Sequence, residues 1–346
     1  MGRKASMEEI AKKLGVSKNT VSLAMRGMPG VSEQTRKLII DTARQAGYEY
    51  KGKSDRAPVQ EASRNICLVL SRELSTSAGF YSNIQFGIEN EAKKNNLNTI
   101  LYYYNDMAEE FEVPLCIKQG IISGVITLGH ISRNTLDALT DLGLPFVVID
   151  EYFDSHRLDY ILTDNIGGGF AAVEYLIRRG HREIGFYGGI HRASSFYDRY
   201  LGCLKALETY RLPIESSYLL TGMSPYSTDE DALQDETAFF RSMKQLPTAF
   251  FCCNDPAALA LYRIFSAMGL KIPGDISIIG FDDVDSSTEV SPQLTTMRVE
   301  KEAMGRRSVI KLLEKFDNKI SIPEKIMLST VLVERQSVRN LAEKPR

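Results

Sequence analysis

The sequence predicts a chain with two kinds of fold, a small all-α head and a larger α/β body. Residues 1–50 have the pattern of three short helices, the first two joined by a tight turn at Gly15. From residue 65 onward, short β-branched runs alternate with amphipathic stretches, which is typical of parallel sheets covered by helices on both faces. The length of 346 residues exceeds what one core usually holds, so two or three domains are expected.

The first two predicted helices form a helix-turn-helix. Ser6 and Glu9 have the spacing of a capping box, and Ser17 is placed to cap the second helix. The apolar residues expected to face inward are Met7, Ile10, Ala11, Leu14, Val21, Ala24 and Met25. The outer face of the second helix then carries Lys18, Asn19, Ser22 and Leu23. A helix that presents such polar groups and is braced by a partner helix is suited to enter the major groove of DNA.

A third helix is expected over residues 32–46, with Ser32 as its N-cap and Gly47 just beyond its end. The side chains expected to point into the head are Leu38, Ile39 and Ala43. Three such helices make a small core, so the head is expected to be only marginally stable alone.

Charge separates the head from the body. Residues 1–56 hold 12 Lys or Arg and 6 Asp or Glu, which leaves 30 of the 42 basic and 38 of the 44 acidic residues for the remainder. A basic head on an acidic body indicates that the head alone meets a polyanion. A merely solvated charged face is the less favoured interpretation, because the positive charge coincides with the helix pair.

The cysteine pattern and the short apolar runs predict a cytoplasmic protein with no membrane partner. The five cysteines have no CxxC pair, which is typical of buried free thiols in a reducing compartment. Of the adjacent Cys252 and Cys253, one is expected to face into its sheet and the other outward. The chain opens without a signal peptide, and its apolar runs are too short for a membrane span. The four histidines lack metal-ligand spacing, so no metal site is expected.

The head closely resembles the headpiece of the LacI/GalR (lactose repressor) family. The resemblance rests on residues 10–22 (IAKKLGVSKNTVS), 30–36 (GVSEQTR) and 46–48 (AGY), with their spacing and their position near the start of the chain. It implies that Lys18 and Asn19 read bases, since Asn pairs with adenine and Lys donates to guanine. It implies that other residues position the helix on the DNA backbone, namely Ser17, Thr20, Ser22, Ser32, Thr35 and Tyr48.

The head departs from the family at two positions. Leu23 stands where many members have a base-contacting Arg, so it either touches a thymine methyl or is inert. Arg26 stands where many members have Asn, and it is expected to contact phosphate. Residues 51–64 are expected to be a flexible linker. In the family this region usually forms a hinge helix that inserts a Leu into the minor groove, but no Leu occurs between residues 49 and 65.

The body shows eight strand patterns and several helical ones. The predicted strands are residues 66–70, 99–103, 124–128, 146–149, 160–163, 183–187, 249–253 and 276–281. The predicted helices include residues 82–95, 166–179, 196–210 and 256–268. The run of three glycines at 167–169 is expected to loosen the start of its helix.

The body, residues 65–338, is similar to the same family throughout. Its landmark segments are residues 163–165 (TDN), 176–185 (LIRRGHREIG), 198–202 (DRYLG), 254–255 (ND), 272–283 (IPGDISIIGFDD), 291–296 (SPQLTT) and 332–338 (LVERQSV). This resemblance implies a two-lobed type I periplasmic-binding-protein-like fold with lobe crossings near 164, 293 and 324. It also implies an effector-binding and dimerisation domain, followed by a tail at 339–346.

Polar side chains at predicted strand ends point to an effector site, because ligands of open α/β sheets bind there. The candidates are Ser71, Phe80, Tyr81, Asp150, Arg199, Asn254 and Asp282. Carboxylates, an amide and an Arg suit the vicinal hydroxyls of a sugar, and aromatic residues could stack on its apolar face. These aromatic candidates are Phe80, Tyr81, Tyr152, Phe196 and Phe281. Structural roles remain open: Asp255 before Pro256 has the pattern of an N-cap, and Arg199 could be a solvated helix residue.

The sequence therefore predicts a DNA-binding transcription regulator that represses and is controlled by a small molecule, with a sugar or sugar derivative as the expected class. It is expected to act as a homodimer on a near-palindromic double-stranded operator. Control by a protein corepressor is the alternative. An enzyme on the same α/β scaffold is disfavoured, since no catalytic motif is present and neither a catalytic residue nor a cofactor is predicted.

Overall fold

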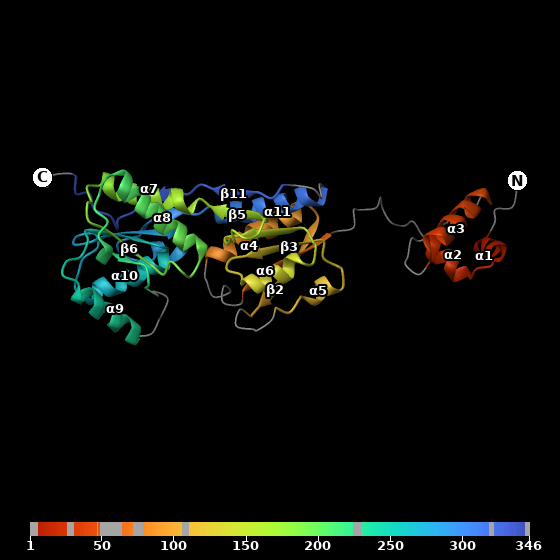
Figure 1. Ribbon diagram of the computed structural model, residues 1–346, viewed down its shortest axis with the longest axis horizontal. Helices are drawn as coiled ribbons and strands as arrows, with labels where there is room; N and C mark the ends of the chain where they lie inside the picture. Colours follow the sequence, from red (N-terminus) through yellow and green to blue (C-terminus); the bar gives the residue numbers. More distant parts are fainter. Residues whose placement is uncertain are drawn as a thin grey trace. The chain divides into compact units, whose positions relative to one another are not determined.

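A computed structural model of the protein falls into two compact units, residues 1–62 and 63–346, which are considered separately below (Figure 1). The structure describes residues 6–25, 31–46, 48, 64–71, 79–105, 111–223, 230–317 and 322–342. The expected linker at 51–64 lies outside these residues except for Arg64, which begins the first strand of the body. Gly47 and Arg26 also lie outside them.

The head is a three-helix unit of α1 (Met7–Leu14), α2 (Lys18–Met25) and α3 (Glu33–Gln45). The predicted capping box is present, because Ser6 Oγ accepts from the Glu9 N–H and the Glu9 carboxylate accepts from the Ser6 N–H. Gly15 ends α1 at φ 66°, a left-handed conformation that glycine adopts without strain. The core consists of Ile10, Ala11, Val21, Ala24, Ile39 and Ala43, all buried.

The expectation that Leu38 points inward is wrong. Its side chain is 56% exposed, whereas Ile39, Thr42 and Ala43 are buried. Residues at i, i+3 and i+4 share one helical face, and the spacing of 39, 42 and 43 turns position 38 toward solvent. Thr42 therefore occupies the inner position that an apolar pattern would not have selected.

The strands of the body form two six-stranded sheets within the described residues. The first sheet has the order β11-β5-β4-β3-β1-β2 and is parallel throughout. Its strands are β1 (Arg64–Ser71), β2 (Leu97–Tyr104), β3 (Gly124–Leu128), β4 (Phe146–Ile149), β5 (Asp159–Thr163) and β11 (Lys325–Leu328).

The second sheet has the order β12-β10-β9-β8-β6-β7, and β12 alone pairs antiparallel among the described strands. Its strands are β6 (Ile184–Tyr187), β7 (Leu219–Leu220), β8 (Ala249–Cys252), β9 (Ser277–Asp282), β10 (Thr295–Arg298) and β12 (Val331–Val333). All eight strands predicted from the sequence are confirmed to within two residues at each end. The four not predicted, β7, β10, β11 and β12, are short, and three of them are edge strands.

Helices cover the sheets of each lobe. The helices of the first lobe are α4 (Phe80–Lys94), α5 (Leu115–Lys118), α6 (Arg133–Thr140) and α11 (Lys301–Asp317). Those of the second lobe are α7 (Asn165–Arg178), α8 (Ser194–Thr209), α9 (Glu230–Ser242) and α10 (Asp255–Ala267), with short 3-10 turns at Ser216–Tyr218 and Asp285–Thr288. Helix α4 packs against α11, and α7 packs against α8 (Figure 1).

The chain passes between the two sheets three times, so the second lobe is inserted into the first. The passages lie at residue 164, between β5 and α7, at 299–300, between β10 and α11, and at 329–330, between β11 and β12. The first agrees with the expected position, and the other two come later than 293 and 324. The expected tail also begins inside the fold, because the Leu341 N–H donates to the Arg179 carbonyl at 2.7 Å.

The three glycines do not loosen the start of α7, and one of them, Gly169, lies at the contact with α8. The helix is regular from Asn165 onward and is capped by the Asp164 carboxylate, which accepts from the Gly167 N–H at 2.8 Å. A Cβ at Gly169 would lie 2.4 Å from the Arg199 carbonyl oxygen in α8. Gly202 of α8 is equally tight against α7, with 2.3 Å from a Cβ to the Ile166 carbonyl. These glycines let α7 and α8 pack backbone to backbone.

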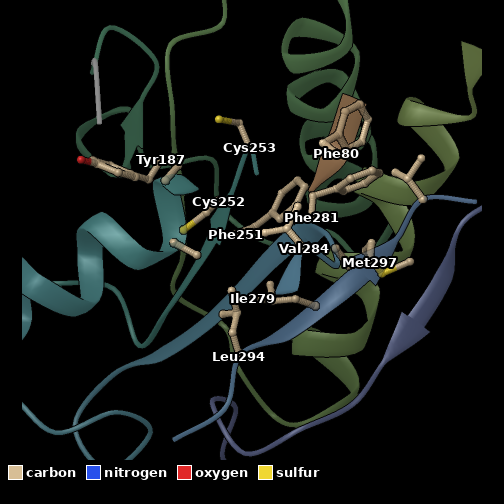
Figure 2. Close-up of a cluster of buried hydrophobic side chains, with 14 of the residues drawn as sticks. Phe80, Tyr187, Phe251, Cys252, Cys253, Ile279, Phe281, Val284, Leu294 and Met297 are labelled. Atoms are coloured by element: carbon tan, nitrogen blue, oxygen red, sulfur yellow. The ribbon is translucent and has the colours of Figure 1, made fainter. Parts of the chain in front are cut away.

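The five cysteines are free thiols, and Cys67, Cys203, Cys252 and Cys253 are buried. Cys252 and Cys253 are both fully buried in one hydrophobic cluster of the body, so neither lies at the surface (Figure 2). In the described part of the chain, no helix combines the length and apolar character that crossing a membrane requires.

Candidate functional site

Several of the predicted DNA-contacting residues of the head, Ser17, Lys18, Thr20, Ser32 and Thr35, lie at the starts of α2 and α3. Ser17 Oγ accepts from the Thr20 N–H at 3.0 Å, and Ser32 Oγ accepts from the Thr35 N–H at 3.2 Å. The hydroxyl pairs Ser17–Thr20 and Ser32–Thr35 are 2.8 and 2.7 Å apart. Helix N-termini with hydroxyl groups are suited to phosphate oxygens, because the first N–H groups and the helix dipole both favour an anion there.

Lys18 is an exposed lysine at the start of α2. Its side chain is 60% exposed, and its ammonium pairs with Glu8 of α1 at 2.5 Å. Ser22 and Leu23 are half-buried on the same helix. Tyr48 is half-buried and packs against the head core. The side chain of Asn19 and the whole of Arg26 lie outside the described residues.

Two side chains outside the predicted set brace this helix pair. Arg36 of α3 donates from Nη1 to the Ala24 carbonyl at 3.1 Å, which satisfies the C-terminal end of α2. Glu8 holds Lys18 from α1. The apolar periodicity of the sequence carries no signal for either contact, because both are made by polar residues on helix surfaces.

In the body, Arg199 is the centre of a buried polar network and only 1% exposed. Its Nε donates to Asn165 Oδ1 at 2.9 Å and its Nη1 to the Cys253 carbonyl at 2.7 Å. Its Nη2 lies 3.0 Å from Asp282 Oδ1. The guanidinium carbon lies 3.8 Å from the centroid of the Phe281 ring, a cation–π contact. The interpretation of Arg199 as a solvated helix residue is therefore wrong.

Asp282, at the end of β9, is contacted by Arg199 of the second lobe and by Lys301 of the first. Its backbone has φ 111° and its side chain is buried. Lys301, the first residue of α11, donates from Nζ to the carbonyls of Asp282 and Asp283 at 2.5 and 3.0 Å. Burial raises the pKa of Asp282, while the charges of Arg199 and Lys301 oppose that rise.

Asp150 faces this network from the first lobe. It follows β4 with φ 64°, and its Oδ2 accepts from the Tyr81 hydroxyl at 3.2 Å. Burial raises the pKa of Asp150 to about 7; the charge of Arg199 lowers it and that of Asp282 raises it. Such coupling requires short distances, so Tyr81 and Asp150 of one lobe lie close to Arg199 and Asp282 of the other.

The remaining candidates have mixed roles. Ser71 is buried at the end of β1, and Phe80 is buried at the start of α4. Phe80, Phe281 and Val284 belong to one buried cluster that joins the two lobes (Figure 2). Phe281 is fully buried beneath Arg199, so the expectation that it stacks on a ligand is not met.

Asn254, not Asp255, caps α10. Asn254 Oδ1 accepts from the Ala257 N–H at 3.0 Å. Asp255 instead binds the loop after β9 and strand β10. Its carboxylate oxygens accept from the Val284 N–H at 2.9 Å and from Thr296 Oγ1 at 2.6 Å. Burial raises the pKa of Asp255 to about 8.

A second cross-lobe contact outside the predicted set, besides that of Lys301, involves Tyr152. The Tyr152 hydroxyl of the first lobe donates to Asp198 Oδ1 of α8 at 3.0 Å, and Lys325 Nζ lies 4.3 Å from the centroid of the Tyr152 ring. Tyr152 was expected only as a stacking ring. Its partner Asp198 directly precedes Arg199, and that adjacency was the one available signal.

Comparison with known proteins agrees with this architecture. Residues 6–49 match the family described as "Bacterial regulatory proteins, lacI family", and residues 173–338 match the "Periplasmic binding protein-like domain". The HTH-type transcriptional repressor PurR of Actinobacillus pleuropneumoniae serotype 3 (strain JL03) is 30% identical over 343 residues, which cover 97% of this chain and 99% of the relative.

Solved structures share the fold. A LacI family transcriptional regulator from Enterococcus faecium with bound ribose is 25% identical, with a TM-score of 0.67 over 80% of this chain and 100% of that one. The transcriptional regulator CelR in its cellobiose complex is 23% identical, with a TM-score of 0.67 over 96% of this chain and 99% of that one. A helix-turn-helix head with a two-lobed α/β body defines a DNA-binding transcriptional regulator. The chain belongs to the LacI family of bacterial regulatory proteins, which confirms the resemblance found in its sequence.

Proposed function

We propose that this protein is a repressor that binds a near-palindromic operator as a homodimer and releases or tightens it in response to a sugar or sugar derivative. The head, residues 1–50, would read the operator, and the body, residues 65–338, would bind the effector and dimerise. The observation that carries the effector role is the cross-lobe group of the half-buried Tyr81 and the buried Asp150, Arg199 and Asp282, which lie close together and would line the effector cleft between the lobes. Related regulators with bound ribose and cellobiose support a carbohydrate.

On DNA, Lys18 and Asn19 would read base edges, and Leu23 would touch a thymine methyl. The residues proposed to position the helix on the backbone are Ser17, Thr20, Ser22, Arg26, Ser32, Thr35 and Tyr48. Exposure of Lys18 and the hydroxyl-bearing helix starts support this division of roles.

In the body, an effector held by residues of both lobes would favour one angle between them. Three chain passages connect the lobes, and Lys301 lies just after the second of them while binding the carbonyls at the end of β9. A change at Asp282 would therefore act directly on the start of α11. This coupling makes operator affinity depend on ligand, and the linkage is reciprocal.

The test has two stages. Selection of duplexes from a random-sequence library by the full chain should return two-fold symmetric half-sites, and asymmetric or sequence-independent binding contradicts the operator proposal. A thermal-shift screen of mono- and disaccharides should then find stabilising compounds that change operator affinity. Stabilising sugars that leave operator affinity unchanged contradict the effector role.

A further inference from the structure

We propose that the effector presents hydrogen-bond donors, and no acid group, to the carboxylates of the cleft. This inference rests on the effector role proposed above and narrows its ligand to neutral or amine-bearing carbohydrates. Hydroxyl and ammonium groups are the two sources of such donors, and matched compounds separate them.

The polar group of the cleft that lacks a hydrogen-bond partner is an acceptor, a carboxylate oxygen of Asp150. Asp150 is 8% exposed, and its Oδ1 is buried without a hydrogen-bond partner among the described residues. Asp282 is 6% exposed, and its Oδ1 pairs with Arg199 Nη2 at 3.0 Å, so Asp150 Oδ1 is the acceptor left for a ligand. A buried acceptor left unpaired costs about 1–3 kcal/mol, more if charged, so a donor placed there is strongly favoured.

The cations of the cleft are already engaged by the protein. Arg199 donates to an amide oxygen and a backbone carbonyl, contacts Asp282, and covers the face of Phe281. Lys301 is 9% exposed and donates to two backbone carbonyls. An acid group entering the cleft would have to displace these protein acceptors to obtain a countercharge.

Further carboxylates stand next to Asp150 and Arg199 in the chain. Glu151 is buried next to Asp150, where its Oε2 lies 3.1 Å from His130 Nδ1 and its Oε1 accepts from the Tyr152 N–H at 3.2 Å. Asp198 accepts from the Tyr152 hydroxyl across the lobes. An anionic ligand would be buried among these like charges, which is unfavourable, whereas an ammonium or hydroxyl group would be stabilised by them.

The test uses sugars that share one skeleton and differ in one group. The glucose and galactose series each provide a parent sugar, its 2-amino-2-deoxy form and its uronic acid, and ribose serves as a neutral pentose. Thermal shift and calorimetry on the full chain measure binding at pH 8, where Asp150, whose pKa burial raises to about 7, is ionised. We expect a parent or amino sugar to bind at least about tenfold more tightly than the acid of its series, as loss of a hydrogen bond to a charged group predicts.

Tighter binding of the amino form identifies ammonium as the donor, and equal or tighter binding of the parent identifies hydroxyl. A uronic acid that binds as tightly as both of its partners overturns the donor inference and leaves the proposed effector role intact. Failure of every compound to bind contradicts the donor inference and the carbohydrate effector together.

A pair of variants provides a second measurement. Asp150→Asn keeps the side-chain size, and Asn tolerates the left-handed backbone at this position. This substitution should weaken binding of the preferred sugar about tenfold or more. It should also reduce the difference in affinity between that sugar and the uronic acid of its series. Asp154→Asn, on the same loop with a side chain 88% exposed, is the matched control and should leave both unchanged. Equal effects of the two substitutions overturn the assignment of Asp150 as the acceptor.

Discussion

The head and the cleft hold their polar residues in opposite ways. In the head, the candidate DNA-contacting residues come from one short stretch, residues 17–48, and Lys18 and Ser17 are open to solvent. In the cleft, Asp150, Arg199 and Asp282 come from distant segments of two lobes and are nearly fully buried. A site on exposed helices costs little to alter, whereas a buried charged network is coupled to the stability of the whole lobe.

The largest effect is expected for Arg199→Ala. Removing one partner of a buried ion pair should lower the free energy of unfolding of the body by about 3–5 kcal/mol, because Asp282 is left buried without its countercharge. It should also abolish the effector response while the head still binds DNA. Denaturant unfolding and operator binding measure the two effects.

Arg298→Ala is the matched control, since this Arg pairs with Asp283 at 3.7 Å and its side chain is 47% exposed. An exposed ion pair of this kind should contribute less than about 1 kcal/mol to the free energy of unfolding. Similar losses for the two substitutions, or an unchanged effector response in Arg199→Ala, would remove the distinction between buried and exposed charge.

Titration of Asp150 should change stability by up to about 4 kcal/mol between pH 4 and pH 7. The unfolded carboxyl loses its proton near its ordinary pKa, but the folded one keeps it until about 7. The contribution is therefore present at low pH and is lost as pH rises through 7. The groups that set this value are Tyr81, Glu151, Arg199 and Asp282, with desolvation as the main cause.

His181 changes the stability of the protein in the opposite direction over part of the range between pH 4 and pH 7. Burial lowers its pKa to about 4, so its contribution grows as pH rises from 4 toward the unfolded value. The difference between the native chain and Asp150→Asn isolates the Asp150 contribution. The native chain should lose stability relative to Asp150→Asn as pH rises, in unfolding curves measured from pH 4.5 to 7.5. A difference that does not vary with pH would contradict this assignment.

Gly202→Ala should lower the free energy of unfolding by about 1–3 kcal/mol. The new Cβ would lie 2.3 Å from the Ile166 carbonyl oxygen and would force α7 and α8 apart. The shift should also weaken the effector response, since Arg199 lies on the same helix. Gly222→Ala is the control: no described atom lies within 4 Å of its Cβ. Equal unfolding free energies for the two variants would show that close helix contact does not position Arg199.

In the head, Lys18→Ala should leave folding nearly unchanged and lower discrimination between operator bases by about 1–3 kcal/mol. Lys12→Ala, an exposed lysine of α1, is the control and should weaken binding to all sequences alike. Competition binding with single-base operator variants separates the two. Retention of full discrimination by Lys18→Ala would contradict its assignment as a base reader.

Much of the fold follows from local sequence. The caps at Ser6, Ser17 and Ser32 and the buried strands are encoded within a few residues of each element, because capping and apolar periodicity depend on near neighbours. Leu38 was mispredicted, and the short strands β10 and β11 were missed, for the converse reason. Their exposure depends on which neighbour covers them, and four-residue segments carry too little periodicity to show it.

The sequence by itself determined that this chain has a helix-turn-helix head, a parallel α/β body and a set of polar residues at strand ends. Tertiary structure alone decided which of those residues act together. It made Asn254 a helix cap, fixed Asp255 to the loop after β9, and brought Asp150 of one lobe toward Arg199 of the other. The physical reason is that charge and desolvation act through space, so the chemistry of the cleft depends on distances that no local pattern encodes.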